Sequence, residues 1–343
     1  MKNETRVELA ILIILAVLLG GWLGWRLIGG GETDSDTPGE PAQAKALATA
    51  GSASQTSLQN RTASQGAAGT TAGPKAESPA RPPKRAEETR TASPDHHLTP
   101  PAIKAGLQEA AALLADEKPG EARTVLTRLI LSAPEGPARE KVKAELVALN
   151  DLLFFSRNPS EHSEMVTVQP GDSLALIAKR QGKDYYFAEL IKTVNGIKDE
   201  KRLRLGRKLK VPKGAFSALV EKRAHRIIIF LEGDYIKEYP IAIGAPTTPT
   251  PEETFTIATK QPKPDWYAPD GNLYKYGHPK NVLGTRWLGF AEKGEYQSYG
   301  IHGTNDPNSI GRNVSNGCVR MLNKDVEEIF SMLQIGDKVQ IVK

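Results

Sequence analysis

The chain has 343 residues, enough for two or more domains, and 25% of them are charged while 6% are aromatic. That composition is ordinary for a soluble protein that includes some disordered sequence. The formal net charge of +5 is modest, and the single cysteine, Cys318, excludes an internal disulfide.

Residues 7–28 are the first predicted element, a membrane-spanning helix. An uninterrupted apolar run at 9–19 is extended by glycines and tryptophans to about the length that crosses a bilayer. No small-x-small cleavage site follows, so we expect an uncleaved signal-anchor over residues 1–30 rather than a cleaved signal peptide. Basic residues precede the run and acidic residues follow it, which favours a membrane-anchored protein with its bulk outside the cytoplasm.

Residues 31–100 are predicted to be a disordered linker. Their only large apolar side chains are Leu47, Leu58 and Leu98. Such a segment cannot bury enough apolar surface to offset its conformational entropy, so we expect a flexible tether. The adjacent His96 and His97 suggest a metal site, but no cysteine or carboxylate cluster accompanies them, and a solvated linker is the simpler interpretation.

Residues 101–157 are predicted to form three short antiparallel helices. Apolar residues recur at helical spacing in three stretches, and turns rich in Pro and Gly separate them. The apolar positions are Leu107, Ala110, Ala111 and Leu114, then Val125, Leu126, Leu129 and Ile130, then Val142, Leu146, Leu149 and Leu153. The pattern leaves open whether this helical module is a spacer or a partner-binding element.

Residues 164–213 read as a compact strand, helix, helix, strand unit. Val166 and Val168 alternate as a strand, a helix capped by Asp172 or Ser173 follows, and a final strand is expected over 203–211. The order of elements, with QPGDSLALIAKR and LRLGRKLKVP, resembles a LysM module. That family binds glycans containing N-acetylglucosamine, including peptidoglycan, although the unit would also serve as a small structural domain.

The positive charge is concentrated in this unit. Residues 165–213 hold twelve Lys and Arg against five Asp and Glu, whereas residues 222–343 hold fifteen against fourteen. An anionic cell wall or membrane surface is therefore the expected partner, and nucleic acid is not, because the chain is expected outside the cytoplasm.

Residues 222–343 are predicted to be a mainly-β domain. Three strands are expected at 227–231, 235–243 and 254–259, with a turn at 232–234 and a closing strand at 337–343. A segment at 261–286, rich in Pro, Gly and aromatic residues, is typical of a functional loop. Asn323 is expected to cap a helix that buries Val326, Ile329, Phe330 and Leu333.

His302 and Cys318 are the candidate catalytic pair. They are sixteen positions apart, and the turn-rich segment between them lets the chain bring imidazole and thiol together. A neighbouring imidazolium favours the nucleophilic thiolate, and amides near Gly317 and Cys318 are placed to hold an oxyanion. The alternative is a buried structural cysteine and histidine. An exported chain with one cysteine carries a free thiol, which favours the catalytic interpretation.

The segment IHGT, followed by SNGCVRM, resembles the signature of the L,D-transpeptidases, the YkuD-like peptidoglycan enzymes. The resemblance implies that Cys318 is the acylated nucleophile, that His302 is its base, and that the Gly303 carbonyl orients the imidazole. It implies a β-sandwich or closed sheet with one helix, a lid at 261–286, and no metal or cofactor. Many members have His where this chain has Asn316.

The whole is expected to be a multidomain α+β protein: a transmembrane helix, a disordered linker, a helical module, a LysM module and a sandwich-like catalytic domain. The resemblance implies cross-linking between the third residues of peptidoglycan stem peptides through a cysteine acyl-enzyme. An L,D-carboxypeptidase, a wall-protein-attaching transferase and an inactive wall-binding scaffold remain alternatives. The expected substrate-binding residues are Arg320, Asn316, Ser315, Gly317 and Tyr299, and a structural ion pair is the alternative for Arg320.

Overall fold

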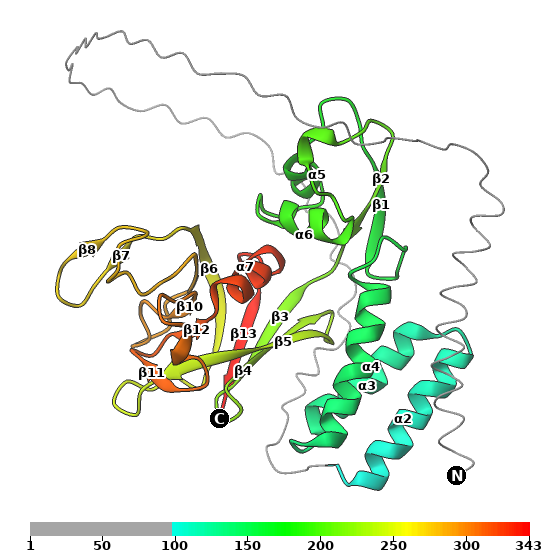
Figure 1. Cartoon of the computed structure of the whole chain (residues 1–343), viewed down its shortest axis with the longest axis horizontal. Helices are drawn as coiled ribbons and strands as arrows, with labels where there is room; N and C mark the ends of the chain where they lie inside the picture. Colours follow the sequence, from blue (N-terminus) through cyan, green and yellow to red (C-terminus); the bar gives the residue numbers. More distant parts are fainter. Residues whose placement is uncertain (1–97) are drawn as a thin grey trace, which may run out of the picture. The chain divides into compact units, whose positions relative to one another are not determined.

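A computed structural model of the protein describes residues 98–343 (Figure 1). The predicted signal-anchor at 1–30 and nearly all of the predicted linker at 31–100 lie outside the described residues, as do His96 and His97. Among the helices that the structure describes, none is both long and apolar enough to cross a membrane.

The three predicted helices are confirmed as α2 (Pro100–Ala115), α3 (Pro119–Ser132) and α4 (Pro137–Leu153). Each has a proline in its first turn, where the missing N–H costs no hydrogen bond. The expected apolar face of α3 is fully buried, whereas on α2 only Ala110 of the four expected positions is buried. α2 is therefore the outer helix of the module, and α3 and α4 hold its core.

The strand, helix, helix, strand order of the LysM unit is also confirmed. Its elements are β1 (Ser163–Thr167), α5 (Leu174–Arg180), α6 (Phe187–Val194) and β2 (Lys208–Pro212), and β1 pairs with β2 in antiparallel fashion. Ser173 is the cap of α5, because its hydroxyl accepts a hydrogen bond from the Leu176 amide.

The expected start of the final LysM strand is wrong. A short 3-10 helix, η1 (Glu200–Arg202), ends just before that stretch, a turn at 205–206 occupies it, and Leu205 is 67% exposed. Gly206 has a φ of +78°, a conformation that turns the chain before β2 can begin. The alternation of Leu203 and Leu205 therefore predicts a strand start that the turn at Gly206 prevents.

The catalytic region is a closed sheet rather than a sandwich. Its strands are β3 (Phe216–Glu221), β4 (Arg226–Leu231), β5 (Asp234–Gly244), β6 (Thr254–Pro262), β9 (Arg286–Phe290), β10 (Gly300–His302), β11 (Asn313–Ser315), β12 (Val319–Met321) and β13 (Lys338–Val342). The order is β11-β5-β12-β10-β9-β6-β13-β3-β4, and pairing of β4 with β5 closes the ring. The sheet includes β3, which begins before the boundary expected at residue 222.

Strand β4 is apolar at almost every position because both of its faces are buried. Ile227, Ile229 and Leu231 belong to the cluster that includes the interior of the closed sheet. Ile228 and Phe230 point to the other side and join the cluster formed by the helical module. An antiparallel strand with one wet face would alternate, so the continuous run in the sequence reflects this second contact.

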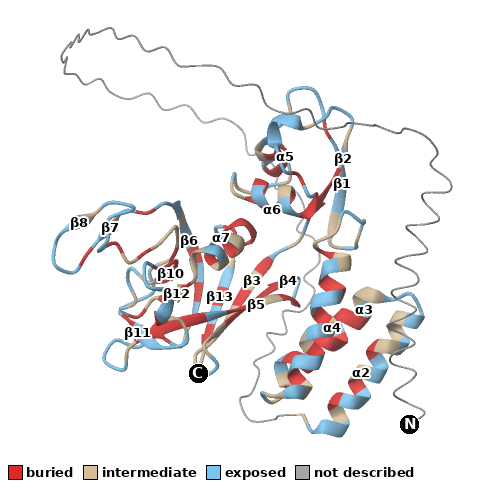
Figure 2. Cartoon of the chain, in the orientation of Figure 1, coloured by how far each residue is buried: buried red, intermediate tan, exposed pale blue. Residues whose placement is uncertain are grey.

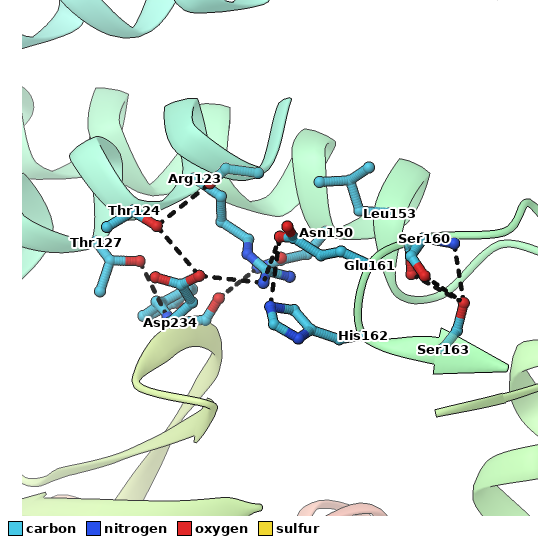
Figure 3. A network of polar contacts seen from close by, with 12 residues as sticks. Arg123, Thr124, Thr127, Asn150, Leu153, Ser160, Glu161, His162, Ser163 and Asp234 are labelled. Atoms are coloured by element: carbon cyan, nitrogen blue, oxygen red, sulfur yellow. Dashed lines mark hydrogen bonds and ion pairs between the residues drawn. The ribbon is translucent and has the colours of Figure 1, made fainter. Parts of the chain in front are cut away.

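The helical module contacts the β4–β5 hairpin through polar as well as apolar groups. Arg139 donates to both carboxylate oxygens of Glu238, at 3.0 and 2.6 Å, and Lys143 lies 2.8 Å from the same carboxylate. Figure 3 shows Arg123 reaching from α3 to Asp234 at the hairpin, at 3.1 Å. Together these five residues form what we call the junction network. Figure 2 shows that both α4 and β5 carry buried residues.

Candidate active site

The site forms where β10 and β12 run side by side. The two strands are parallel, with Ile301 opposite Val319 and His302 opposite Arg320. Cys318 immediately precedes β12, so this register places it beside Gly300, near His302 in the same strand. The chain between His302 and Cys318 therefore returns to the same place, as predicted. The pairing of β10 with β12 in the sheet fixes this return.

The His302 imidazole is buried and has a defined orientation. Its Nδ1 lies 2.7 Å from the carbonyl oxygen of Gly303, which can only accept, so Nδ1 carries the proton and Nε2 keeps its lone pair. Trp287 stacks on the ring with centroids 6.0 Å apart. Burial, aided by the Arg320 charge and opposed by the Gly303 hydrogen bond, lowers the pKa of His302 to about 4. The ring is therefore a neutral base.

The Cys318 thiol is also neutral at rest. Its Sγ is 3.8 Å from the Ser298 carbonyl oxygen. Burial raises the pKa of Cys318 to about 11, although a backbone hydrogen bond with Gly300 and the Arg320 charge act in the opposite direction. The expectation that a neighbouring imidazolium lowers this pKa is wrong, because the buried ring holds no proton on Nε2 to supply that charge.

Ser315 and Gly317 shape the turn before Cys318. The buried Ser315 hydroxyl donates to the Cys318 carbonyl at 2.6 Å and accepts from the Gly317 amide at 3.2 Å. Gly317 has a φ of +105°, and a Cβ there would lie 2.5 Å from Cε1 of Tyr299. Tyr299 thus packs on this turn, whereas Asn316 is exposed. Substrate contact by these four residues stays a prediction.

Arg320 has a buried hydrogen-bond donor without an acceptor. Its buried Nε has no hydrogen-bond partner, and none of the ion pairs among residues 98–343 includes it. Burial lowers the pKa of Arg320, while the charges of Asp306 and Cys318 oppose that shift. The structural ion pair considered for Arg320 is therefore not observed in the described part of the chain.

Asn323 contacts the loop after His302, and its expected capping role is wrong. It is not the cap of α7 (Asn323–Met332), since Leu322 holds the cap position and no side chain caps the helix. Its amide instead bonds to the backbones of Thr285 and Thr304, far apart in sequence. A repeated Gly-Thr pair, at 284–285 and 303–304, is the only trace of this arrangement in the sequence.

The segment at 261–286 carries a small hairpin of β7 (Trp266–Tyr267) and β8 (Leu273–Tyr274), which extends away from the closed sheet in Figure 1. Trp266 stacks on Tyr274 with ring centroids 5.7 Å apart, and Tyr267 is 79% exposed. Its action as a lid stays a prediction.

Comparison with known proteins assigns the class. The family model described as the L,D-transpeptidase catalytic domain, YkuD, matches residues 216–341, and the LysM domain model matches residues 166–212. YqjB of Bacillus subtilis, provisionally named an L,D-transpeptidase, is 39% identical over 124 residues, which cover 36% of this chain and 69% of YqjB. The chain belongs to the YkuD family of L,D-transpeptidases.

Other L,D-transpeptidases match this chain over a smaller share of their own length. YkuD of Bacillus licheniformis, also provisionally named an L,D-transpeptidase, is 42% identical over 106 residues, or 31% of this chain and 53% of that protein. The solved L,D-transpeptidase from Mycobacterium smegmatis has 22% identity and a TM-score of 0.31, and the match covers 40% of this chain and 64% of that one. A TM-score of that size adds nothing to the assignment.

Proposed function

We propose that this protein is a peptidoglycan L,D-transpeptidase that works through an acyl-enzyme on Cys318. The observation that supports the proposal is the parallel register of β10 and β12, which brings the position of Cys318, the only cysteine of the chain, near the strand that holds His302 with its Nδ1 on the Gly303 carbonyl. A nucleophile, a base and a group that orients the base are the three parts that cysteine acyl transfer requires.

In the first half-reaction, Sγ attacks the carbonyl carbon between an L-centre and the terminal D-Ala of a tetrapeptide stem while Nε2 of His302 takes the thiol proton. The tetrahedral oxyanion needs hydrogen-bond donors. The Gly317 amide already donates to Ser315, which leaves the Cys318 amide for this role. Collapse forms the thioester, and the imidazolium returns its proton to the departing D-Ala amine.

In the second half-reaction, the side-chain amine of the third residue of a neighbouring stem attacks the thioester. Neutral His302 takes a proton from that amine, the new amide bond joins the two stems, and the proton returns to Sγ as the thiol is released. The cross-link therefore lies between third residues, and the enzyme returns to its resting, uncharged state.

Arg320 is proposed to bind a carboxylate of the stem peptide. Arg320 is opposite His302 in the register of the neighbouring strand, and its buried Nε has no hydrogen-bond partner. A carboxylate oxygen would satisfy that donor and offset the burial of the charge. Arg320→Met should therefore raise KM for a stem peptide more than it lowers kcat, measured by D-Ala release.

The remaining parts are proposed to hold the catalytic region at the cell wall. The LysM unit would bind the glycan strands, and residues 1–30 would anchor the chain in the cytoplasmic membrane with the enzyme outside the cytoplasm. Deleting residues 165–212 should weaken pull-down by insoluble peptidoglycan while the thiol stays reactive. Recovery of a soluble exported form that begins near residue 31 would contradict the anchor.

The test of the chemistry is acylation by a carbapenem, followed as a mass increase of the intact protein. Wild type should gain one adduct, and Cys318→Ala should gain none because the chain has no other thiol. Asn316→His should react like wild type, since Asn316 is exposed and has no proposed part in proton transfer. An adduct on folded Cys318→Ala would contradict the assigned nucleophile, and an unreactive wild type would favour an inactive scaffold.

The acyl acceptor distinguishes the transpeptidase from its two related alternatives. Mass spectrometry of muropeptides made by the purified enzyme should reveal dimers linked between third residues. Tripeptide stems without dimers would instead identify an L,D-carboxypeptidase, in which water takes the acyl group. Stems attached to a protein amine would identify a wall-protein-attaching transferase.

A further inference from the structure

The side chain of Asn323 binds the loop that follows His302. Oδ1 accepts hydrogen bonds from the Thr304 amide at 3.0 Å and the Thr285 amide at 3.2 Å, and Nδ2 donates to the Thr304 carbonyl at 2.9 Å. Asn323 thus binds both backbone groups of Thr304, as a neighbouring strand would. Thr304 is 1% exposed, so its backbone groups depend on protein partners for their hydrogen bonds.

The geometry of one peptide unit links this contact to the catalytic base. The Thr304 N–H and the Gly303 C=O belong to the same planar, trans peptide, so they point in opposite directions. When the N–H is fixed toward Asn323, the carbonyl oxygen is directed to the other side. There it accepts the Nδ1 proton of His302 at 2.7 Å. Donation by the N–H also polarises the carbonyl and strengthens that second bond.

Two glycines make room for this side chain. A Cβ built on either Gly303 or Gly284 would lie 2.2 Å from Oδ1 of Asn323, a separation that real atoms do not show. Gly284 also has a φ of +64°, which disfavours other residues there. These positions lie on two different segments, yet both are shaped around the same oxygen. This is independent of the hydrogen bonds and indicates that the position of Oδ1 matters.

We infer that Asn323 is a positioning residue that fixes the Gly303–Thr304 peptide and so sets the tautomer of His302. The role rests on the proposed function, because a fixed Nδ1 proton matters only if Nε2 must take a proton from Cys318. Without Asn323, the peptide can rotate and the Nδ1 hydrogen bond is lost. The ring can then carry its proton on Nε2, where it cannot act as a base toward the thiol.

The experiment measures the tautomer and the chemistry separately in full-length protein. Nitrogen NMR of the histidine rings reports whether His302 carries its proton on Nδ1, and the rate of carbapenem acylation reports catalysis. Asn323→Ala should lose the single Nδ1–H form and acylate about ten- to a hundredfold more slowly, the usual effect of losing a group that orients a catalytic ligand. Asn323→Asp keeps an oxygen that accepts from the Thr304 and Thr285 amides but loses the Nδ2 donor to the Thr304 carbonyl, so it should retain the Nδ1–H form while acylating more slowly than wild type.

A matched control exists in Asn195, which is 2% exposed and binds both backbone groups of Lys210, at 2.9 and 2.7 Å. Asn195→Ala loses an equivalent buried contact in the LysM unit and should leave the His302 tautomer and the acylation rate as in wild type.

An Asn323→Ala protein with the wild-type tautomer and rate would overturn the inference. So would a folded Asn323→Asp protein that lost the Nδ1–H form, and this variant decides the matter if the alanine variant does not fold. A wild type that is never acylated would contradict the proposed function instead. Comparing the His302 tautomer in wild type and in the Asn323 variants would still show whether Asn323 sets that tautomer.

Discussion

Among the places where the described residues bury ionisable side chains, the junction network and the active site treat them in opposite ways. In the junction network, burial by itself raises the pKa of Glu238, but hydrogen bonds and charges from Arg139 and Lys143 outweigh it and lower the pKa to about 2. In the active site, burial outweighs the Arg320 charge at Cys318 and adds to the effect of that charge at His302, and it leaves both groups neutral. Burial alone does not decide whether a group is charged; the partners buried with it do.

The difference suits the two tasks. The junction joins the helical module to the β4–β5 hairpin, and paired charges with defined geometry hold that contact. The active site must pass a proton from thiol to imidazole, and two neutral groups can do so without first separating charge.

The largest effect is expected from the base. His302→Ala should slow acylation by a carbapenem by about a hundred- to ten-thousandfold, the usual contribution of a general base. Stopped-flow kinetics would measure the rate. His162→Ala, which removes a ring beside Glu161 near Arg123, is the control and should acylate at the wild-type rate. A His302→Ala protein that kept the full rate would show that another group takes the thiol proton.

The junction network should show its effect in stability. Arg139→Met leaves Glu238 buried with only Lys143 as a partner and should lower the free energy of unfolding by about 3 kcal/mol, measured by urea denaturation. The double variant Arg139→Met/Glu238→Leu removes both charges and should recover most of that loss. If the single and double variants were equally unstable, packing rather than charge would account for the contact.

The two clusters should lose stability in different ranges of acid pH. The pKa values of His302 and Glu238 are both lower in the folded than in the unfolded chain, so each group stabilises the protein above its unfolded pKa. Each loses that effect as the pH falls through its folded pKa. For His302 this window runs from 6.5 down to about 4, and for Glu238 from 4.5 down to about 2. Urea denaturation across pH should show His302→Gln flattening the upper window and Arg139→Met/Glu238→Leu flattening the lower one.

The smallest effect is expected where a charge pair stays in water. Arg128 and Glu109 lie 3.7 Å apart, and their side chains are 52% and 57% exposed. Solvent screens such a pair, and holding two long side chains in place offsets the attraction. Arg128→Ala should therefore leave the urea denaturation midpoint at the wild-type value. A clear loss would mean that exposure, too, fails to predict which charges matter.

Much of this arrangement could be predicted from local sequence. Three helices, the LysM unit, the turn after β4 and the return of the chain that brings Cys318 near His302 all follow from patterns within short stretches. The closed sheet was expected only as one of two possibilities, because closure depends on β4 and β5 pairing across the whole ring. Strand β3, adjacent to the LysM unit, gave no separate signal.

What could not be predicted depends on contacts between distant segments. Asn323 opens a helix and has the residue type of a cap, yet it bonds to Thr285 and Thr304. The pKa of Cys318, a half-buried residue, depends on the loss of solvent around its thiol in the folded chain, which no spacing reveals. The apolar run in β4 reflects a helical module that contacts it from outside the sheet.

The most direct test of this account is the ionisation of Cys318 itself. Thiolate absorbs in the ultraviolet where thiol does not, and the difference between wild type and Cys318→Ala isolates the single cysteine from the tyrosines. The account predicts that this difference signal stays absent through neutral pH and rises only as the pH approaches about 11. A thiolate signal already present at neutral pH would contradict it, because the resting site would then hold a thiolate and an imidazolium rather than two neutral groups.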